Sequence, residues 1–327
     1  MINKKKINII IYSELGKRNS GSGHFLRSLN LKKYLSNCSS KIVILFNKNI
    51  NKKKFAKKNI FFLKKENHII KFVKKDFKNL LIIDKYKINH NTLNNVKKYF
   101  NKIIIFNDLE FLKKVDKNII LINSQVTSKK KITKNKLIGS HYFPVNIELL
   151  NVRKKYKIKK NLKNIFVFFG GSIDTKKTRK IIIKLNSLIN QKVNFFIYSN
   201  NNWKLKKLPK NIKFIKIKKN YYSDLLKYDA GIISSGFIKF DLLTIGMPVV
   251  YIPMYLHQIK LAKQYSNSNF GINLGYYKNI NKNRKSLDLN ISKNLLPYKK
   301  RYYMFNNYRS NFDGKGIIRI KKILLNL

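Results

Sequence analysis

Residues 7–35 read INIIIYSELGKRNSGSGHFLRSLNLKKYL and contain the pattern from which the fold follows. Mostly apolar, β-branched residues fill positions Ile7–Ser13, and this predicts a strand that is buried on both faces. A polar loop with Gly21 and Gly23 comes next, and a helical pattern then runs to Leu35. A strand, a glycine loop and a helix in that order begin a parallel α/β unit.

The same alternation continues along the 327 residues. Short apolar runs alternate with longer helical patterns, which predicts an α/β protein with two doubly wound, Rossmann-like domains. The expected strands are Ile7–Ser13, Lys41–Phe46, Leu80–Asp84, Lys102–Asn107, Asn118–Asn123, Asn164–Phe169, Val193–Ser199, Ile212–Ile217, Ala230–Ser234 and Pro248–Ile252. The expected helices are Gly23–Leu35, Lys65–Phe77, Asn89–Phe100, Thr175–Asn190, Tyr221–Lys227, Phe237–Ile245, Gln258–Ser266, Leu296–Asn307 and Gly316–Leu325.

A break in this pattern sets the expected domain boundaries. Residues 143–161 lose the alternation and contain a cationic run from Arg153 to Lys160. We therefore expect an N-terminal domain at 1–145, a hinge at 146–161 and a C-terminal domain at 162–327. Two such domains are expected to face a cleft at the carboxyl ends of both sheets, where ligands bind.

The charge is extreme, because 72 Lys and Arg residues oppose 14 acids and give a net charge of +58. Only eight of the cations are Arg, the residue best suited to bidentate contacts with phosphates and bases. We therefore expect no specific nucleic-acid partner. The scattered lysines are typical of AT-rich codon usage, yet they attract anions, so nucleotide sugars and peripheral contact with an anionic membrane are expected.

Cysteine content and hydropathy narrow the class further. The single cysteine, Cys38, excludes an intrachain disulfide and a thiolate zinc site. No apolar run reaches about 18 residues, so no membrane-spanning helix is expected. The sequence thus predicts a cytoplasmic protein. We also expect a monomer without a cofactor.

The loop before the first helix is the first candidate site. Gly21 and Gly23 allow backbone N–H groups to turn toward a ligand, and a helix N-terminus adds about half a positive charge. His24, in the first turn, has a setting that favours the neutral imidazole of a general base. Arg27, one turn later, is suited to hold a phosphate or a carboxylate. The alternative is an ordinary turn with a surface histidine.

Two later loops are suited to bind a nucleotide. Gly170 and Gly171 form a turn that either caps the next helix or closes over a phosphate. Ser235 and Gly236 precede a helix whose free N–H groups can bind a diphosphate. Asp241, on that helix, can accept hydrogen bonds from both hydroxyls of a ribose, or it is simply a solvated acid.

Three other residues end strands or begin helices at the same expected sheet edges. His257 and Gln258 begin a helix and could reach a sugar, although a histidine at a helix start is more often inert. Asp84 ends a buried strand, where an acid either contacts a ligand or caps the next helix. We expect a functional role for Asp84.

Together these segments resemble a known family. The loop from Gly21 to Arg27 is similar to the G-x-G-H-x-x-R signature of the UDP-sugar hydrolases of pseudaminic acid biosynthesis and of their spore-coat polysaccharide relatives. The resemblance continues in family order through Ile83-Asp84, Asn107-Asp108-Leu109, Phe169-Gly170-Gly171-Ser172, Gly236 to Asp241, Gly246-Met247-Pro248, Gln258, Asp313-Gly314-Lys315-Gly316 and Arg319-Ile320. It covers nearly the whole chain.

The resemblance implies the two-domain GT-B fold of the MurG-type glycosyltransferases and a UDP-linked amino-deoxy sugar as substrate. It implies hydrolysis of the anomeric C–O bond without a metal, with release of UDP, in nonulosonic acid or surface-glycan biosynthesis. By position, His24 matches the catalytic histidine and Asp241 the ribose-binding carboxylate, which is usually Glu. Ser235, Gly236 and Gly171 are then expected to hold phosphate.

The sequence departs from the family pattern at three places. Phe237 and Ile238 replace residues that supply hydroxyl contacts to phosphate, His257 replaces Asn, and Asp241 is one C–C bond shorter than Glu. Three alternatives therefore stay open. They are a GT-B glycosyltransferase with a UDP-sugar donor, a polybasic nucleic-acid or membrane-surface binder, and a non-catalytic homologue that only binds a nucleotide sugar.

Overall fold

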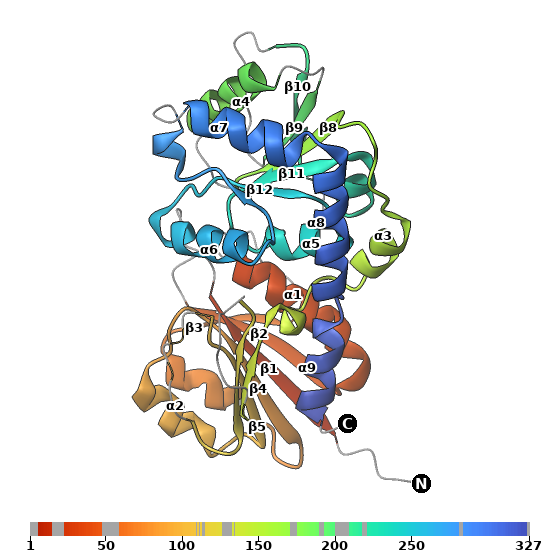
Figure 1. Cartoon of the computed structure of the whole chain (residues 1–327). Coiled ribbons are helices and arrows are strands. Elements are labelled where there is room, and N and C mark those ends of the chain that lie inside the picture. The colour runs from red at the N-terminus through yellow and green to blue at the C-terminus, as the bar shows by residue number, and fades with distance from the viewer. Residues whose placement is uncertain are drawn as a thin grey trace. The chain divides into compact units, whose positions relative to one another are not determined.

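The computed structural model describes residues 6–14, 23–47, 59–108, 110, 112, 115–125, 133, 135–170, 175–189, 193–199, 209–217, 221–280 and 284–325. These residues form two compact units, each with its own parallel sheet (Figure 1). The first unit takes its residues from 6–147 and 315–325, and the second from 148–314.

The first unit has a seven-stranded sheet in the order β3-β2-β1-β4-β5-β6-β7. Its strands are β1 (Ile7–Ser13), β2 (Lys41–Asn47), β3 (Ile60–Leu63), β4 (Lys78–Asp84), β5 (Lys102–Phe106), β6 (Ile119–Asn123) and β7 (Lys136–Ile138). Its helices are α1 (Gly23–Leu35), α2 (His90–Lys97), α9 (Gly316–Leu325) and the 3₁₀ helices η1 (Ser36–Cys38), η3 (Glu66–Phe72) and η4 (Ser140–Tyr142). The chain crosses over between β3 and β4, as it does in Rossmann sheets.

The apolar composition of β1 follows from its place in the middle of this sheet. Side chains of a strand alternate between the two faces, so Ile9 and Ile11 pack with α1 and α9 on one side. Ile10 and Tyr12 pack with η3 and α2 on the other. Both faces are covered, and all four side chains are fully buried.

The second unit has a six-stranded parallel sheet in the order β10-β9-β8-β11-β12-β13. Its strands are β8 (Asn164–Phe168), β9 (Asn194–Ser199), β10 (Ile212–Lys216), β11 (Ala230–Ile233), β12 (Val249–Tyr251) and β13 (Ile272–Asn273). Its helices are α3 (Leu149–Lys155), α4 (Thr175–Leu188), α5 (Ile238–Ile245), α6 (Leu256–Asn267), α7 (Arg284–Asn290), α8 (Tyr298–Asn311), the 3₁₀ helices η5 (Ser223–Lys227) and η6 (Tyr277–Asn279), and the π-helix η7 (Ile291–Leu295).

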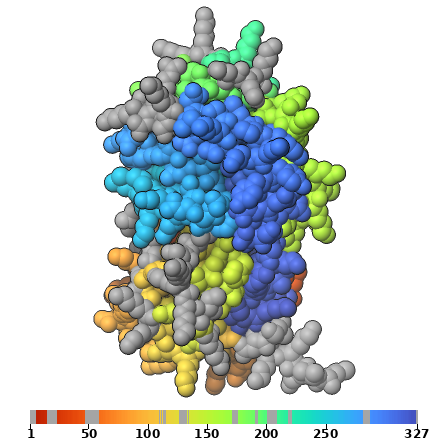
Figure 2. Space-filling view, in the orientation of Figure 1, coloured from red at the N-terminus to blue at the C-terminus, as the bar shows by residue number. Residues whose placement is uncertain are grey.

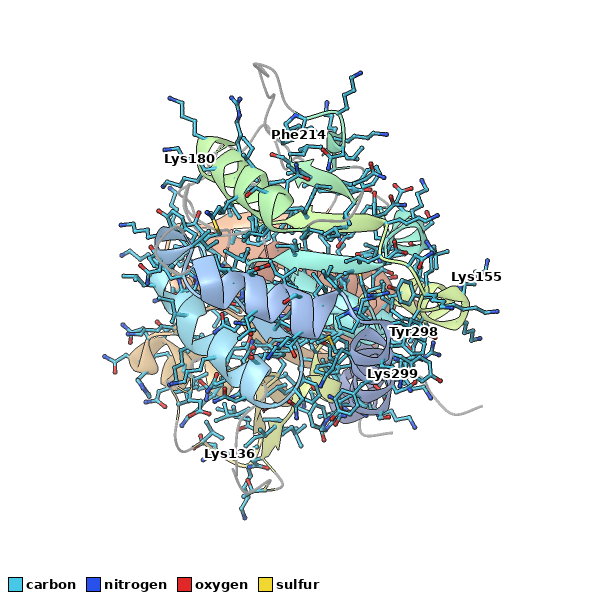
Figure 3. All side chains as sticks on the ribbon, turned by 45° about the horizontal axis from the view of Figure 1, so that its top comes forward. Lys136, Lys155, Lys180, Phe214, Tyr298 and Lys299 are labelled. Atoms are coloured by element: carbon cyan, nitrogen blue, oxygen red, sulfur yellow. The ribbon has the colours of Figure 1, made fainter. Side chains whose placement is uncertain are left out.

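The outer layer of the second unit comes largely from its last helices. Atoms of residues 256–267 and 287–311 make up much of the face of this unit that Figure 2 turns toward the viewer. Lysine side chains such as Lys155, Lys180 and Lys299 project outward from their helices (Figure 3). Their solvated positions fit a lysine excess that is carried by the surface.

The ten expected strands are confirmed, each within two residues of its observed ends. The sequence pattern missed β3, β7 and β13, and each of these lies at the edge of its sheet. An edge strand is covered less completely than a central one, so its apolar pattern is shorter and weaker. The expected helix Lys65–Phe77 is the shorter 3₁₀ helix η3, and a right-handed helix could not continue through Asp76, whose φ is 64°.

Two segments differ from the sequence-based organisation. A helix, α3, lies within the segment expected to be a hinge without pattern, and it buries Leu149 and Val152. Helix α9 lies within the range predicted for the C-terminal domain, 162–327, but it packs against the first sheet. At its start, a Cβ on Gly316 would collide with the carbonyl oxygen of Phe143, so this close approach requires glycine.

Candidate functional site

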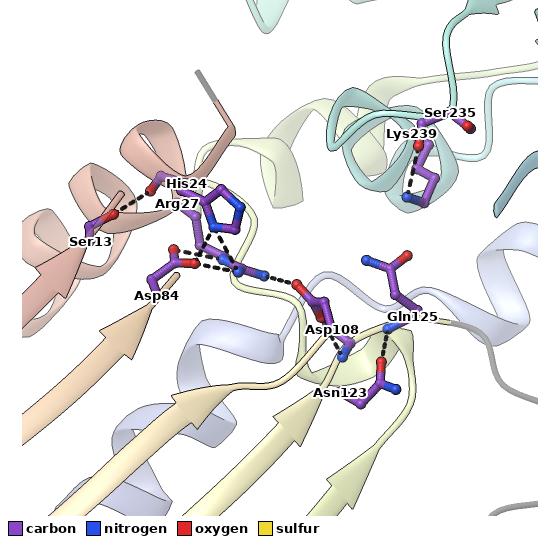
Figure 4. A network of polar contacts seen from close by, with 10 residues as sticks. Ser13, His24, Arg27, Asp84, Asp108, Asn123, Gln125, Ser235 and Lys239 are labelled. Atoms are coloured by element: carbon purple, nitrogen blue, oxygen red, sulfur yellow. Dashed lines mark hydrogen bonds and ion pairs between the residues drawn. The ribbon is translucent and has the colours of Figure 1, made fainter. Parts of the chain in front are cut away.

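His24 and Asp84 meet at the carboxyl end of the first sheet. His24 lies in the first turn of α1, directly after the loop that follows β1, and Asp84 is the last residue of β4. Because β1 and β4 are neighbours in register, Ser13 pairs with Asp84 and the two loops adjoin. The Nδ1 atom of His24 lies 2.5 Å from Oδ1 of Asp84, and both side chains are buried (Figure 4).

Arg27 holds the Asp84 carboxylate from the other side. Its Nε donates to Oδ2 of Asp84 at 2.8 Å, its Nη2 donates to Oδ1, and its Nη1 donates to Oδ2 of Asp108 at 2.8 Å. The guanidinium also lies over the ring of Phe106, 4.0 Å from its centroid. Burial lowers the pKa of Arg27, but the two carboxylates outweigh burial and raise it above its ordinary value.

The same contacts keep Asp84 ionised. Burial raises the pKa of the Asp84 carboxyl, but Arg27 and His24 lower it more, to about 2. An anionic carboxylate at Nδ1 favours the tautomer in which Nδ1–H donates to Asp84. The basic lone pair then lies on Nε2, which is the arrangement of a general base oriented by a buried acid.

The polar network continues along the sheet edge. Oδ1 of Asp108, after β5, accepts hydrogen bonds from the backbone N–H and the hydroxyl of Ser124, at 3.1 and 2.7 Å. Ser124 follows β6, where the backbone N–H of Gln125 donates to Oδ1 of Asn123 at 3.0 Å. Polar side chains from three neighbouring strand ends are thereby joined (Figure 4).

Tyr86 is a neighbour of His24 that the sequence analysis did not identify. Its ring meets the imidazole edge-on, with 4.5 Å between centroids and 78° between planes. The backbone N–H of Tyr86 donates to Oε2 of Glu14 at 3.1 Å, which ties the loop after β4 to the end of β1. The sequence signal that could have identified Tyr86 is its position two residues after Asp84, the aspartate that ends β4.

In the second unit, the turn between β11 and α5 is held by its own side chains. Ser234 Oγ donates to the carbonyl of Phe169 at 3.0 Å, and Ser235 Oγ donates to the carbonyl of Gln258 at 2.8 Å. Lys239 Nζ donates to the carbonyl of Ser235 at 3.2 Å (Figure 4). The hydroxyl of Ser235 is therefore engaged by the protein, and its predicted contact with phosphate stays a prediction.

Gly236 has no packing neighbour that requires a glycine. A Cβ there would meet Ser234 O at 3.7 Å and Ser234 Oγ at 3.8 Å, which are ordinary contact distances. The first turn of α5 also has no side-chain cap. The backbone N–H groups of Gly236, Lys239 and Phe240 already donate to backbone carbonyls. What favours an anion here is the space beside Gly236 together with the positive end of the helix dipole.

Asp241 lies in the first turn of α5 and is hydrogen-bonded to Tyr221. The Tyr221 hydroxyl donates to Oδ2 of Asp241 at 2.8 Å. Burial raises the pKa of Asp241 to about 7, although this hydrogen bond acts in the opposite direction. Tyr221, which precedes η5, was not identified from the sequence.

The remaining predicted residues have varied surroundings. Oε1 of Gln258 accepts from the backbone N–H of Met254 at 2.9 Å, so this side chain caps the start of α6. His257 is exposed and lies parallel to the Tyr255 ring, with 5.8 Å between centroids. Gly170 has a φ of 117°, a conformation that glycine adopts without strain. Gly21, Gly171 and Ser172 lie outside the described residues.

Two searches of the described residues gave no site. No group of three or more His, Cys, Asp or Glu side chains in these ranges is arranged to hold a metal ion. None of the helices in the described part of the chain is both long and apolar enough to cross a membrane.

Two doubly wound units on parallel sheets have the GT-B fold of nucleotide-sugar glycosyltransferases. MurG of Acinetobacter baumannii has a TM-score of 0.60 at 11% identity, and the match covers 98% of this chain and 100% of MurG. The spinosyn rhamnosyltransferase SpnG complexed with thymidine diphosphate has a TM-score of 0.63 at 9% identity and covers 97% and 100%.

Sequence comparison finds more specific relatives. The chain is 24% identical over 198 residues to the spore coat polysaccharide biosynthesis protein SpsG of Bacillus subtilis, covering 58% of each chain. It is 26% identical over 335 residues to an uncharacterized protein, MJ1062, of Methanocaldococcus jannaschii, covering 94% of this chain and 64% of that protein. The chain thus spans about three fifths of the length of these relatives. No protein-family model matches the sequence.

Proposed function

We propose that the protein hydrolyses a UDP-linked amino-deoxy sugar at its anomeric C–O bond and serves surface-glycan or nonulosonic acid biosynthesis. His24 is the general base, and residues 235–241 bind the nucleotide. Water attacks the anomeric carbon and gives a proton to His24, the bond from that carbon to the diphosphate oxygen breaks, and UDP leaves with the bonding electrons. The anomeric centre is inverted in this single displacement.

The contact between His24 and Asp84 carries the proposal. A base that removes a proton from water needs a fixed ring and a basic nitrogen, and a general base of this kind contributes roughly 10²- to 10⁴-fold to a rate. The buried carboxylate at 2.5 Å from Nδ1 supplies both requirements. The second carboxylate, Asp108, balances the charge of Arg27, so the cation that orders Asp84 is itself held in place.

The binding of the nucleotide is supported by the start of α5. Backbone N–H groups at a helix N-terminus favour phosphate, and Gly236 leaves room for close approach. Asp241, five residues later, presents carboxylate oxygens that suit ribose hydroxyls. UDP is a better leaving group when its charge is neutralised, and helix dipoles and a lysine-rich surround provide that neutralisation.

A GT-B glycosyltransferase with a UDP-sugar donor is the second candidate. The solved structures with this fold are supporting evidence, because SpnG is named a rhamnosyltransferase and was solved in complex with thymidine diphosphate. In that case His24 would remove the proton of an acceptor hydroxyl rather than that of water.

Incubation of the full chain with UDP-sugars in the absence of an acceptor separates the two candidates. We expect free sugar and UDP in equal amounts from the hydrolase. UDP-sugar that is bound but consumed only when an acceptor is added would identify a transferase instead. Parallel reactions with dTDP- and CMP-linked sugars test the nucleotide.

The role of His24 is tested in the same assay. His24→Ala and His24→Asn should bind UDP with nearly unchanged affinity and lose turnover, and Asn keeps an N–H group that can donate to Asp84. His90→Ala, at an exposed position of α2, is the matched control and should be as active as the unchanged protein. Activity retained in both His24 variants would disprove the assignment.

A further inference from the structure

Asp241 differs from the paired aspartates of this very basic chain. The sequence has 72 cations for 14 acids, yet within the described ranges Asp241 makes no ion pair. Its partner there is a neutral hydroxyl, that of Tyr221, at 2.8 Å from Oδ2. By contrast, Asp84, Asp108 and Asp229 each contact a cation.

The arginines of the two helices packed against α5 donate to backbone carbonyls rather than to Asp241. Arg153 of α3 donates to the carbonyls of Thr244, Arg309 and Phe312, and Arg309 of α8 donates to the carbonyl of Arg153. Arg301 of α8 donates to the carbonyls of Leu295, Leu296, Lys159 and Lys160.

The same holds for the strands and for α5 itself. The Tyr251 hydroxyl of β12 donates to the carbonyl of Phe270, and β11 consists of Ala, Gly and Ile residues. The ammonium of Lys239 donates to the carbonyl of Ser235 and lies near the rings of Phe240 and Tyr265. Lys154, Lys155, Lys299 and Lys300, on α3 and α8, are exposed. Burial and Tyr221 therefore set the state of Asp241.

We propose that Tyr221 is a positioning residue that aims the Asp241 carboxylate at the 2′,3′-diol of a ribonucleotide and makes nucleotide binding depend on the charge of that carboxylate. This inference rests on the proposed function. An ionised carboxylate has about four lone-pair sites. Tyr221 takes one on Oδ2, and the remaining sites of both oxygens suit two neutral hydroxyl donors.

The arrangement explains how a shorter acid could serve at this position. Compared with Glu, Asp has one fewer rotatable bond, so fewer conformations are lost when it is held in place. A tyrosine hydroxyl that is fixed through its ring adds a second constraint. Burial and Asp241 raise the pKa of Tyr221 well above its ordinary value, so its hydroxyl stays protonated and remains a donor.

The proposal predicts a pH dependence with a definite sign. Because Asp241 has a pKa of about 7, the carboxylate form is lost as the pH falls through neutrality. A protonated carboxyl has an O–H donor of its own and accepts fewer hydroxyls. UDP affinity should therefore fall on the acid side, approaching ~10-fold for each pH unit below the pKa.

The test measures the dissociation constant of UDP by titration calorimetry from about pH 5.5 to about pH 9. Tyr221→Phe removes the hydrogen bond that lowers the pKa of Asp241, so the midpoint should move to higher pH. At the alkaline end, the variant should recover the part of its affinity that is lost through protonation of Asp241, but not the part that depends on the position of the carboxylate. Discrimination of UDP from its 2′-deoxy analogue should also weaken in Tyr221→Phe.

Two further variants test whether the pH dependence comes from the Asp241 carboxylate and whether the effect is specific to the Tyr221 hydroxyl. Asp241→Asn should bind weakly and retain only the pH dependence of the UDP phosphate itself. Tyr198→Phe removes a hydroxyl that is hydrogen-bonded to Tyr228 at 2.8 Å in the same unit, and it should leave the UDP profile unchanged. Thermal melts check that each variant is folded.

The outcomes distinguish the inference from the proposed function. A protein that binds no UDP at any pH contradicts the proposed function. UDP binding whose midpoint is the same in Tyr221→Phe and the unchanged protein overturns the role of Tyr221 alone. UDP binding in Asp241→Asn equal to that of the unchanged protein overturns the role of the carboxylate.

Discussion

Asp84 and Arg27 form a bidentate ion pair, in which Nε of the arginine donates to Oδ2 of the aspartate and Nη2 donates to Oδ1. The pair joins the end of β4 to the first turns of α1, across 57 residues of sequence. Arg27 is 2% exposed, and its guanidinium contacts two aspartates. Its observed role is to hold Asp84, and its predicted contact with a ligand stays a prediction.

Replacement of Asp84 by Asn should lower turnover by roughly 10²- to 10⁴-fold, because an amide neither fixes the His24 tautomer nor stabilises an imidazolium. UDP affinity should be nearly unchanged, since the nucleotide contacts are proposed on residues 235–241. The rate of UDP release and the UDP dissociation constant are measured together. Asp116→Asn, at an exposed ion pair with Lys97, is the control. Turnover equal to that of the control would contradict the orientation of His24 by Asp84.

Asp84 should also shape the acid unfolding of the protein. Its pKa is about 2 in the folded chain against an ordinary value of 3.8, so its stabilising effect is complete above about pH 4. That effect is lost as the pH falls toward 2 and amounts to about 2 kcal/mol. In denaturant titrations, the stability difference between the unchanged protein and Asp84→Asn should shrink over this range. A difference that is constant with pH would rule out this linkage.

Gly236 and Gly246 provide a matched pair of glycines at the two ends of α5. Gly236→Ala should leave the melting temperature unchanged and weaken UDP binding by roughly tenfold or more, because the added Cβ occupies space beside the helix start. Gly246 has a φ of 89°, and a Cβ there would lie 2.8 Å from the Phe305 ring. Gly246→Ala should therefore destabilise the protein by about 1–3 kcal/mol. Calorimetric melts and UDP titrations distinguish the two effects, and an equal loss of stability at both positions would refute the contrast.

Gly316→Ala should weaken the packing of α9 on the first sheet. The new Cβ would collide with the backbone carbonyl of Phe143, which cannot rotate away as a side chain can. Hydrogen exchange should then increase in α9 and in the strands beneath it, with little change in α5 or β12. Lys322→Ala, on the exposed side of the same helix, is the control. Exchange in α9 that matches this control would show that the contact is not essential.

The sequence predicts the central strands well and the sheet edges poorly, for one physical reason. A strand such as β1 is covered on both faces, so nearly every residue must be apolar and the run is easy to recognise. β13 pairs over two residues, too few to leave a pattern. Helix α3 has only two buried residues, Leu149 and Val152, and its last turn is Arg153-Lys154-Lys155. Two buried apolar positions next to a cationic run are too few to show a helical periodicity.

The sequence identifies candidate site residues one at a time, but it does not show which of them contact one another. His24 and Gly236 stand in recognisable loops after strands, and their neighbours could be named from the sequence. Asp84 was expected to be functional, but its contact with His24, 60 positions away, was not predicted. Tyr221, 20 positions from its partner Asp241, was not identified at all. Such pairs depend on strand order and on loop conformation, which the apolar pattern does not encode.

The position of α9 has a consequence for synthesis of the chain. On the ribosome, residues 6–147 emerge first, but Ile9, Ile11 and Ile104 lack their cover of Ile317, Ile320 and Leu324 until the last helix has been made. The second unit, whose residues are contiguous over 148–314, can collapse around its own core in the meantime. A nascent chain stalled before residue 315 would therefore expose part of the apolar face of the first sheet, to which chaperones could bind.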